Sequence, residues 1–368
     1  MKARGQALAW GALLAALLLP DASGQQANPP RPAQQSLQEF RLRIQVDLVT
    51  TPVTVFDSRG EFIYGLTRND FAVWDNGVPQ QISQFEFSDS PISLAVLLNT
   101  SSRVQPLLDR VRQIGILINS YILGERGEAA VVTFDDEVHV RQEFTSDSEM
   151  LEKAIKAVKP GGDRTRLADA IDTAIRLLVP RPAERRKAIL IVSEPRDVGS
   201  ETPLGEALRT AQLADITIYT VGLSYTEALW RTKPQDRQPP SSPYPPGVFP
   251  TPPLPGTPQT PTTEQQNRAR ADLLALIQVL VSTLRAPIQQ DVLEVLAAGT
   301  GGMAHGQASD EALQAAINRI GQELHNQYVL AYRPSNLNQE GFHEIRVRVR
   351  RSDVLVRSRP GYYLGHPE

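Results

Sequence analysis

Apolar and polar residues alternate along residues 40–90, where every second side chain is hydrophobic over several short runs. Turn sequences such as Asp75-Asn76-Gly77 separate these runs. A period of two interrupted by such turns predicts short antiparallel strands. The same pattern returns in residues 326–368. Because a few strands alone cannot bury a hydrophobic face, we expect the two segments to form one small β unit together.

Residues 91–325 follow a different pattern, in which continuous apolar runs alternate with helical spacing. Residues 94–98 and 188–192 are uninterrupted apolar runs, whereas residues 104–118 place apolar side chains three and four positions apart. Fully apolar runs predict strands buried on both faces, and intervening helices allow such strands to lie parallel. The sequence therefore predicts an α/β fold with a doubly wound, mostly parallel, Rossmann-like sheet that helices cover on both sides.

The first of these apolar runs ends abruptly in Asn99-Thr100-Ser101-Ser102-Arg103. These side chains carry amide, hydroxyl and guanidinium groups, and a helical pattern begins directly after them. Doubly wound sheets bind ligands at the carboxyl ends of their strands. We therefore predict that this segment contributes to a binding site.

A proline-rich stretch at residues 232–265 interrupts the α/β pattern. Such a composition cannot recover its ordering entropy by burial, and it predicts a disordered surface insertion. Two roles are consistent with it, either a solvated spacer or a docking segment for a partner with an SH3-like groove.

The N-terminus has the composition of a signal peptide. Lys2 and Arg4 precede an apolar core at residues 7–19, and small residues follow it, so we predict a signal peptide at residues 1–24. A polar, proline-rich lead-in follows at residues 25–39. The protein is thus expected to be exported, to the periplasm or the extracellular space, with no transmembrane span after cleavage. An uncleaved membrane anchor is the alternative.

Composition argues against several classes of function. The 368 residues have a formal net charge of -3, whereas a nucleic-acid binder needs a basic face. Histidine spacing gives no zinc motif, and the chain has no nucleophile elbow, phosphate loop or dinucleotide fingerprint. We therefore expect neither an enzyme nor a small-molecule cofactor. The acidic run Asp135-Asp136-Glu137 follows an apolar run, and turn formation explains it better than metal binding does.

Five short motifs occur in a characteristic order. They are Gly65-Leu66-Thr67-Arg68-Asn69-Asp70-Phe71-Ala72-Val73 and residues 93–98, 165–171, 328–332 and 359–362. With these motifs the central segment resembles a von Willebrand factor type A (VWA) domain. The whole chain resembles a bacterial family of exported VWA-related proteins. The resemblance implies the same α/β fold and a non-enzymatic, adhesion-like binding function.

The VWA family often carries a metal-ion-dependent adhesion site, in which three loops hold Mg²⁺ or Mn²⁺ through oxygen ligands. The resemblance places five residues at the corresponding positions. Asn99 stands where the family has its first Asp, and Ser101 and Thr165 keep the family's Ser and Thr. Arg103 replaces the second Ser, and Glu194 replaces the second Asp.

These replacements disfavour a metal ion, because one carboxylate is lost and a guanidinium is added. At a few ångströms, an arginine repels a divalent cation by several kcal/mol at intermediate dielectric. Three interpretations follow. The site binds Mg²⁺ or Mn²⁺ through Ser101, Thr165, Asn99 and Glu194; or Arg103, held by Glu194, replaces the metal and binds an acidic side chain; or the site is inactive.

The function that the sequence predicts is an exported, non-enzymatic protein-binding module. It recognises a protein partner, through an acidic side chain, at the carboxyl edge of its sheet and at this degenerate adhesion site. The alternative is a structural or assembly component of the cell envelope in which the metal site is inactive.

Overall fold

The computed structural model describes residues 48–87, 90–223, 291–306, 310–335 and 341–364. All of these residues belong to one unit of the chain, Val46–Glu368. The predicted signal peptide, the lead-in at residues 25–39 and the proline-rich insertion at residues 232–265 lie outside the described residues. The domain boundaries drawn from the sequence stay predictions.

A six-stranded sheet forms the α/β part, with the strand order β10-β9-β8-β5-β6-β7. Neighbouring strands are parallel except for β7, which pairs antiparallel with β6 at one edge. Every residue of β5 is buried, as its continuous apolar pattern predicts. The strands are β5 (Ile92–Asn99), β6 (Glu128–Phe134), β7 (Val138–Thr145), β8 (Arg186–Ser193), β9 (Thr217–Gly222) and β10 (Ala304–His305).

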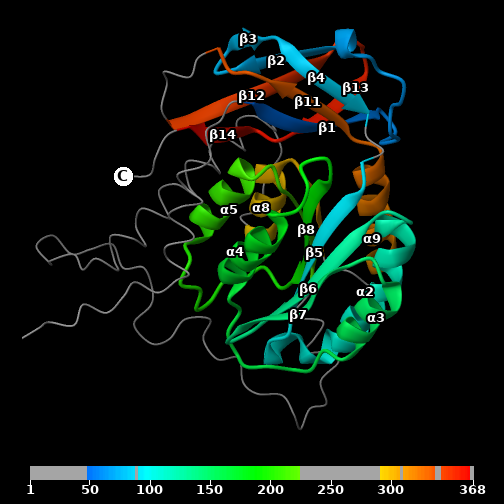
Figure 1. Ribbon diagram of the computed structural model, residues 1–368, viewed down its shortest axis with the longest axis vertical. Coiled ribbons are helices and arrows are strands. Elements are labelled where there is room, and N and C mark those ends of the chain that lie inside the picture. Colours follow the sequence, from blue (N-terminus) through cyan, green and yellow to red (C-terminus); the bar gives the residue numbers. More distant parts are fainter. Residues whose placement is uncertain (1–47, 88–89, 224–290, 307–309, 336–340, 365–368) are drawn as a thin grey trace, which may run out of the picture. The chain divides into compact units, whose positions relative to one another are not determined.

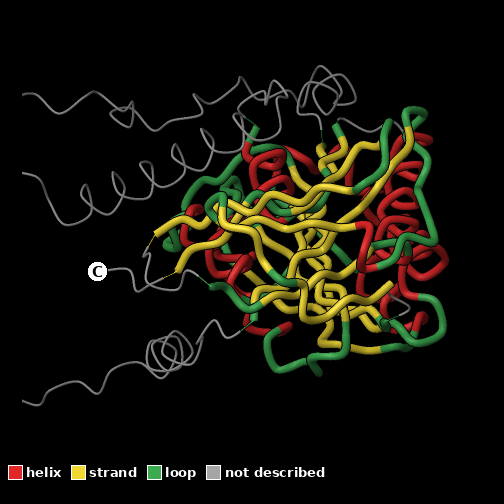
Figure 2. The backbone as a smooth tube through the Cα atoms, turned by 90° about the horizontal axis from the view of Figure 1, so that it is seen from above, coloured by secondary structure: helices red, strands yellow, loops and turns green. Residues whose placement is uncertain are grey.

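Helices cover both faces of this sheet, so the predicted doubly wound fold is confirmed (Figure 1). One face carries α2 (Leu108–Ile118), α3 (Ser148–Lys156) and α9 (Asp310–His325), and the other carries α4 (Leu167–Leu178), α5 (Leu204–Leu213) and α8 (Val292–Thr300). Seen from above, helices lie on either side of the strands (Figure 2). Alternate residues of β5 enter the two separate cores. Within the described residues, no helix combines the length and the apolar character needed to cross a membrane.

The two terminal segments form a β sandwich together, as the sequence predicts. One sheet has the order β13-β1-β11-β4 and the other β14-β12-β2-β3, so each sheet combines strands from both ends of the chain. The strands are β1 (Val49–Asp57), β2 (Phe71–Asp75), β3 (Val78–Gln80), β4 (Ile82–Phe87), β11 (Tyr328–Tyr332), β12 (Gly341–Val349), β13 (Val354–Ser358) and β14 (Gly361–Leu364). A single hydrophobic core fills the space between the two sheets.

A buried carboxylate joins the two sheets of the sandwich. Asp75 on β2 is fully buried and accepts hydrogen bonds from the hydroxyls of Tyr332 on β11 (2.9 Å) and Tyr362 on β14 (2.8 Å). Its other oxygen lies 2.6 Å from Nδ1 of His343 on β12. Burial and the neighbouring carboxylate raise the pKa of both tyrosines, so both stay protonated as donors.

Buried charges also connect the sandwich to the α/β part. The Glu323 carboxylate on α9 is fully buried, and burial raises its pKa. It accepts hydrogen bonds from Arg357 on β13 and from the hydroxyl of Tyr219 on β9. The Arg359 guanidinium donates to the backbone oxygen of Gln212 on α5 (2.8 Å). Because a buried charge without a partner costs several kcal/mol, these contacts fix how the two parts pack.

The pKa of His305 on β10 provides a test of the packing between the sandwich and the α/β part. Burial, together with the guanidinium groups of Arg357 and Arg319, lowers this pKa from 6.5 to about 4. Between these values the unfolded chain binds more protons than the folded protein, so this histidine makes the free energy of unfolding rise with pH. We expect His305→Asn to reduce that rise by at most about 1.4 kcal/mol per pH unit.

Denaturant titration of the full chain from about pH 4 to about pH 7 measures this slope. The control is His139→Asn on β7, whose side chain is 42% exposed and should leave the slope almost unchanged. Equal slopes for the native chain and for His305→Asn would mean that packing between the two parts does not suppress protonation of this histidine.

Candidate functional site

Three loops meet at the carboxyl edge of the central sheet. Strands β5 and β8 pair in parallel, with Leu98 opposite Val192, so the residues that follow both strands are neighbours. The loop before α4 joins them, because the Ser102 N–H donates to the Gly162 carbonyl oxygen (2.8 Å). The structure therefore brings together all five residues that the sequence singled out.

An ion pair occupies the centre of this edge. Nε of Arg103 lies 2.9 Å from each carboxylate oxygen of Glu194. The Glu194 side chain is only 2% exposed, whereas that of Arg103 is 18% exposed. Arg196 approaches the same carboxylate (3.7 Å), and the Thr165 hydroxyl donates to it (3.4 Å). Two guanidinium groups thus balance one buried carboxylate.

Asn99 holds the loop rather than offering a ligand atom. Its carbonyl oxygen Oδ1 accepts the backbone N–H of Ser101 (2.8 Å), and its amide donates to the Ser193 hydroxyl (3.1 Å). That hydroxyl in turn donates to the backbone oxygen of Glu194 (2.8 Å). The Asn99 side chain is fully buried, so these contacts are shielded from water.

Ser101 has unused hydrogen-bonding capacity. Its side chain is fully buried. Within the part of the chain that the structure describes, its Oγ has no hydrogen-bond partner. A buried hydroxyl without a partner costs free energy, and a ligand that reached it would recover that cost.

The residues present do not fit Mg²⁺ or Mn²⁺ in this arrangement. The single carboxylate is already compensated by two arginines, and Asn99 offers a neutral oxygen that the loop uses. Hard divalent cations prefer several oxygen ligands that include carboxylates, and a guanidinium within contact distance opposes them. In the described ranges, no three acidic, histidine or cysteine side chains gather into a metal-binding group.

The acidic run after β6 forms a turn, as predicted. Oδ1 of Asp135 accepts the backbone N–H of Asp136 (2.7 Å), and Oδ2 accepts the hydroxyl of Thr100 (2.6 Å). The backbone N–H of Asp135 donates to the Glu137 carbonyl oxygen (3.0 Å). This turn therefore also supports the loop that carries Asn99 and Ser101.

Sequence reasoning missed two contributors to the site. Arg196 follows Glu194 by two positions, and the second cation in this short loop was the available signal. Asp197 accepts the backbone N–H of Leu167 (3.0 Å) at the start of α4. Burial raises the pKa of Asp197. This carboxyl group anchors α4, which begins two residues after Thr165.

Comparison with known proteins identifies the central segment. The family model described as von Willebrand factor type A domain matches residues 94–195, so the resemblance to this domain family is confirmed there. No curated protein matches the chain.

Solved structures with a similar arrangement are distant. An aerotolerance-related membrane protein from Bacteroides fragilis is 15% identical, with a TM-score of 0.40; the match covers 63% of this chain and 99% of that one. The conserved hypothetical protein BatB from Bacteroides thetaiotaomicron is 17% identical, with a TM-score of 0.32, and covers 36% and 66%. Proximal thread matrix protein 1 from the mussel byssus, with a zinc-occupied MIDAS motif, is 18% identical, with a TM-score of 0.32, and covers 38% of both chains. This chain therefore spans less than two thirds of the length of the last two.

The double variant Asn99→Asp/Arg103→Ser should bind a divalent cation. It removes the guanidinium from Glu194, adds a second carboxylate and supplies a further hydroxyl, which together give a hard cation its preferred ligands. Calorimetric titration with Mg²⁺ and Mn²⁺ should show saturable binding, and the metal should raise the melting temperature.

The matched control is Asn99→Asp/Arg112→Ser, which keeps Arg103 and removes instead an arginine that pairs with Asp109 on α2. It should bind metal no better than the native chain does. A folded Asn99→Asp/Arg103→Ser variant without metal binding would show that Arg103 is not what disfavours the cation.

Proposed function

Because residues 94–195 match the family model of the von Willebrand factor type A domain, we propose that this protein is an exported, non-enzymatic, adhesion-like binding protein. It captures a protein partner at the carboxyl edge of the central sheet. The partner contributes an acidic side chain, and Arg103 receives it in place of a metal ion.

The contact between Arg103 and Glu194 is the observation that carries this proposal. In a metal-containing site, the cation lies between the protein's carboxylates and the partner's carboxylate. Here the Arg103 guanidinium compensates the charge of Glu194 as a cation would. Its Nε lies 2.9 Å from each carboxylate oxygen of Glu194. The positive end of the pair is the more exposed one. A charge-assisted hydrogen bond to an incoming carboxylate fits this polarity.

Ser101 and Arg196 make the site at the sheet edge more suitable for a carboxylate. The buried Ser101 hydroxyl lacks a partner within the described residues and can donate to a carboxylate oxygen. Arg196 adds a second positive charge next to Glu194. Positive groups at this position favour an acidic side chain over a basic one.

Export rests on the sequence pattern of residues 1–24, a basic start followed by a short apolar core. We propose the periplasm or the extracellular space as the location.

An assembly component with an inactive site is the second candidate. It is favoured by the internal hydrogen bonds of Asn99, whose amide and carbonyl groups are both used within the chain. Such a protein would use other surfaces for its contacts, and substitutions at the sheet edge would not change them.

Arg103→Ala should weaken the binding of acidic peptides. The probe is an array of peptides with a single Asp or Glu among neutral residues, each paired with its Asn or Gln counterpart. Loss of a charge-assisted hydrogen bond of about 1.5–3 kcal/mol predicts a loss of affinity of about tenfold or more. Thr165→Ala should have a smaller effect, since this residue supports Glu194.

Arg103→Ala leaves Glu194 with less compensation, so Arg103→Ala/Glu194→Ala removes both charges and keeps the test valid if the single variant unfolds. Arg59→Ala, at an exposed turn where Arg59 pairs with Asp57, is the control. Unchanged affinity in the folded double variant, or equal binding of acidic and amide peptides, would favour the assembly component.

A further inference from the structure

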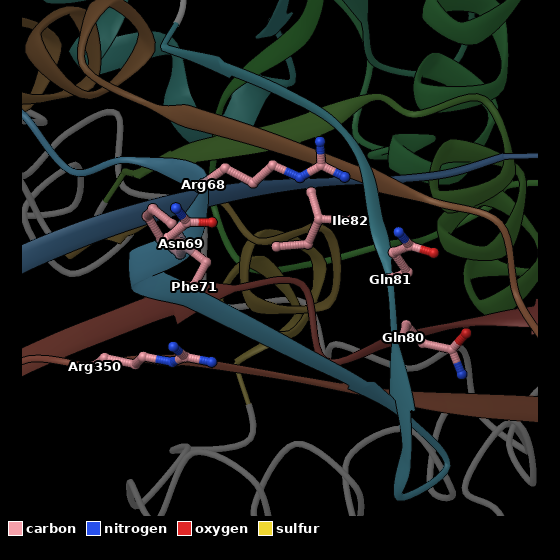
Figure 3. A pocket seen from close by; sticks show the side chains of 7 residues that line it. All are labelled: Arg68, Asn69, Phe71, Gln80, Gln81, Ile82 and Arg350. Carbon is pink, nitrogen blue, oxygen red and sulfur yellow. The ribbon is translucent and has the colours of Figure 1, made fainter.

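A second cationic site lies on the β sandwich, at the point where the chain crosses from one sheet to the other. A cleft of about 470 Å³ opens there. Arg68 and Asn69 form one wall, and Gln80 and Gln81 form the opposite wall (Figure 3). Nothing in the proposed function uses this cleft.

The floor of the cleft is apolar and its ends are basic. Phe71 and Ile82 are 4% and 6% exposed and belong to the sandwich core. Arg68 extends from its wall toward β4, and Arg350, directly after β12, lies at the other end (Figure 3). None of the lining residues is acidic.

The sequence motif at residues 65–73 builds this wall. Its Asp70 accepts hydrogen bonds from the backbone N–H and the hydroxyl of Thr67, both at 2.7 Å. Both hydrogen bonds hold the pKa of Asp70 below its usual value, and the bond from the backbone N–H has the larger effect. The backbone N–H of Arg350 donates to the Asp70 carbonyl oxygen (2.8 Å), which holds the two basic residues at one cleft.

The lining of the cleft includes two arginines and no carboxylate. The nearby Asp70 carboxylate accepts two hydrogen bonds from Thr67 and also attracts the Arg350 guanidinium. Within the described residues, the side chain of Arg68 has no hydrogen bond or ion pair. Gln80 is fixed, because its amide oxygen accepts the backbone N–H of Ser335 (3.0 Å). The cleft therefore suits an anionic group held between two arginines.

An unpaired strand edge adjoins the cleft. Strand β4 starts at Ile82 and ends its sheet, with pairing in the described residues only to β11. Such an edge is a template for an added strand. At its far end, Tyr64 and Phe87 are 55% and 47% exposed and pack edge to face, with ring centroids 6.3 Å apart.

We propose that this edge binds an extended acidic segment of a protein partner, with one carboxylate held between Arg68 and Arg350. The added strand lies along β4, and an apolar side chain contacts Tyr64 and Phe87. Strand β4 is bulged, and Ile82 and Phe87 lie opposite Tyr332 and Tyr328, which are four strand steps apart. Four steps span about 13 Å at about 3.3 Å per residue. The acidic and the apolar residue of the ligand are therefore about four positions apart, on the same face of the added strand.

The experiment uses fluorescein-labelled, end-blocked pentapeptides that have Asp at one end, Phe at the other and alternating Thr and Val between. Both chain orders are used, each with an Asn-for-Asp counterpart. Fluorescence anisotropy with the native full chain and with the full chain carrying Arg103→Ala/Glu194→Ala distinguishes binding at the cleft from binding at the proposed VWA site. One Asp peptide should bind about tenfold more tightly than its Asn counterpart.

Arg68→Gln/Arg350→Gln should weaken that binding about tenfold. The matched control is Arg346→Gln/Arg348→Gln, which removes the same charge from the outer face of β12, where Arg346 pairs with Glu344 and Arg348 covers Trp74. This control should stay within about twofold.

Thermal melting shows that each variant is folded. The proposal is overturned if neither chain order binds, if Asp and Asn peptides bind equally, or if the two double variants lose affinity equally. Peptide binding that requires Arg103 would likewise overturn it and would assign the peptide to the VWA site.

Discussion

The buried carboxylate of Glu194 sets the chemistry of the sheet edge, because a charge with 2% exposure needs a positive partner within contact distance. A divalent cation and an arginine are two solutions to the same requirement, and they exclude each other at this distance. This chain uses Arg103, supported by Arg196. The neutral Asn99 fits the same solution, since a second carboxylate would call for more positive charge.

This ion pair depends in turn on the rigidity of the strands beneath it. Strand β5 is buried along its whole length, and its parallel pairing with β8 fixes the register of the two loops that carry Arg103 and Glu194. The Asp135 turn and the Asp197 anchor hold the surrounding segments. A binding group placed on such a scaffold loses little entropy when a partner arrives.

The molecule presents two cationic sites of different construction. At the sheet edge the charge is buried and paired, so geometry limits which carboxylates reach it. In the sandwich cleft the arginines lie at the rim of an apolar floor, beside an open strand edge. The two proposed ligands differ accordingly, a single acidic side chain at the first site and an extended segment at the second.

The sequence alone determined the fold class. Apolar residues recur every two positions in half-buried strands and about every 3.6 positions in helices, so their spacing shows which elements form and which faces are buried. The end of the first buried strand indicated a site at Asn99, Ser101 and Arg103, and the resemblance to VWA domains added Thr165 and Glu194 to it. The sequence could not determine that Asn99 uses both ends of its amide within the loop, that Arg196 reaches Glu194, or that burial lowers the pKa of His305. It could not reveal the cleft either, since Arg68 and Arg350 are far apart in the chain and meet only through the pairing of β2 with β12. Hydrogen-bond partners, pKa values and clefts depend on distances between side chains remote in sequence, and only the tertiary structure sets those distances.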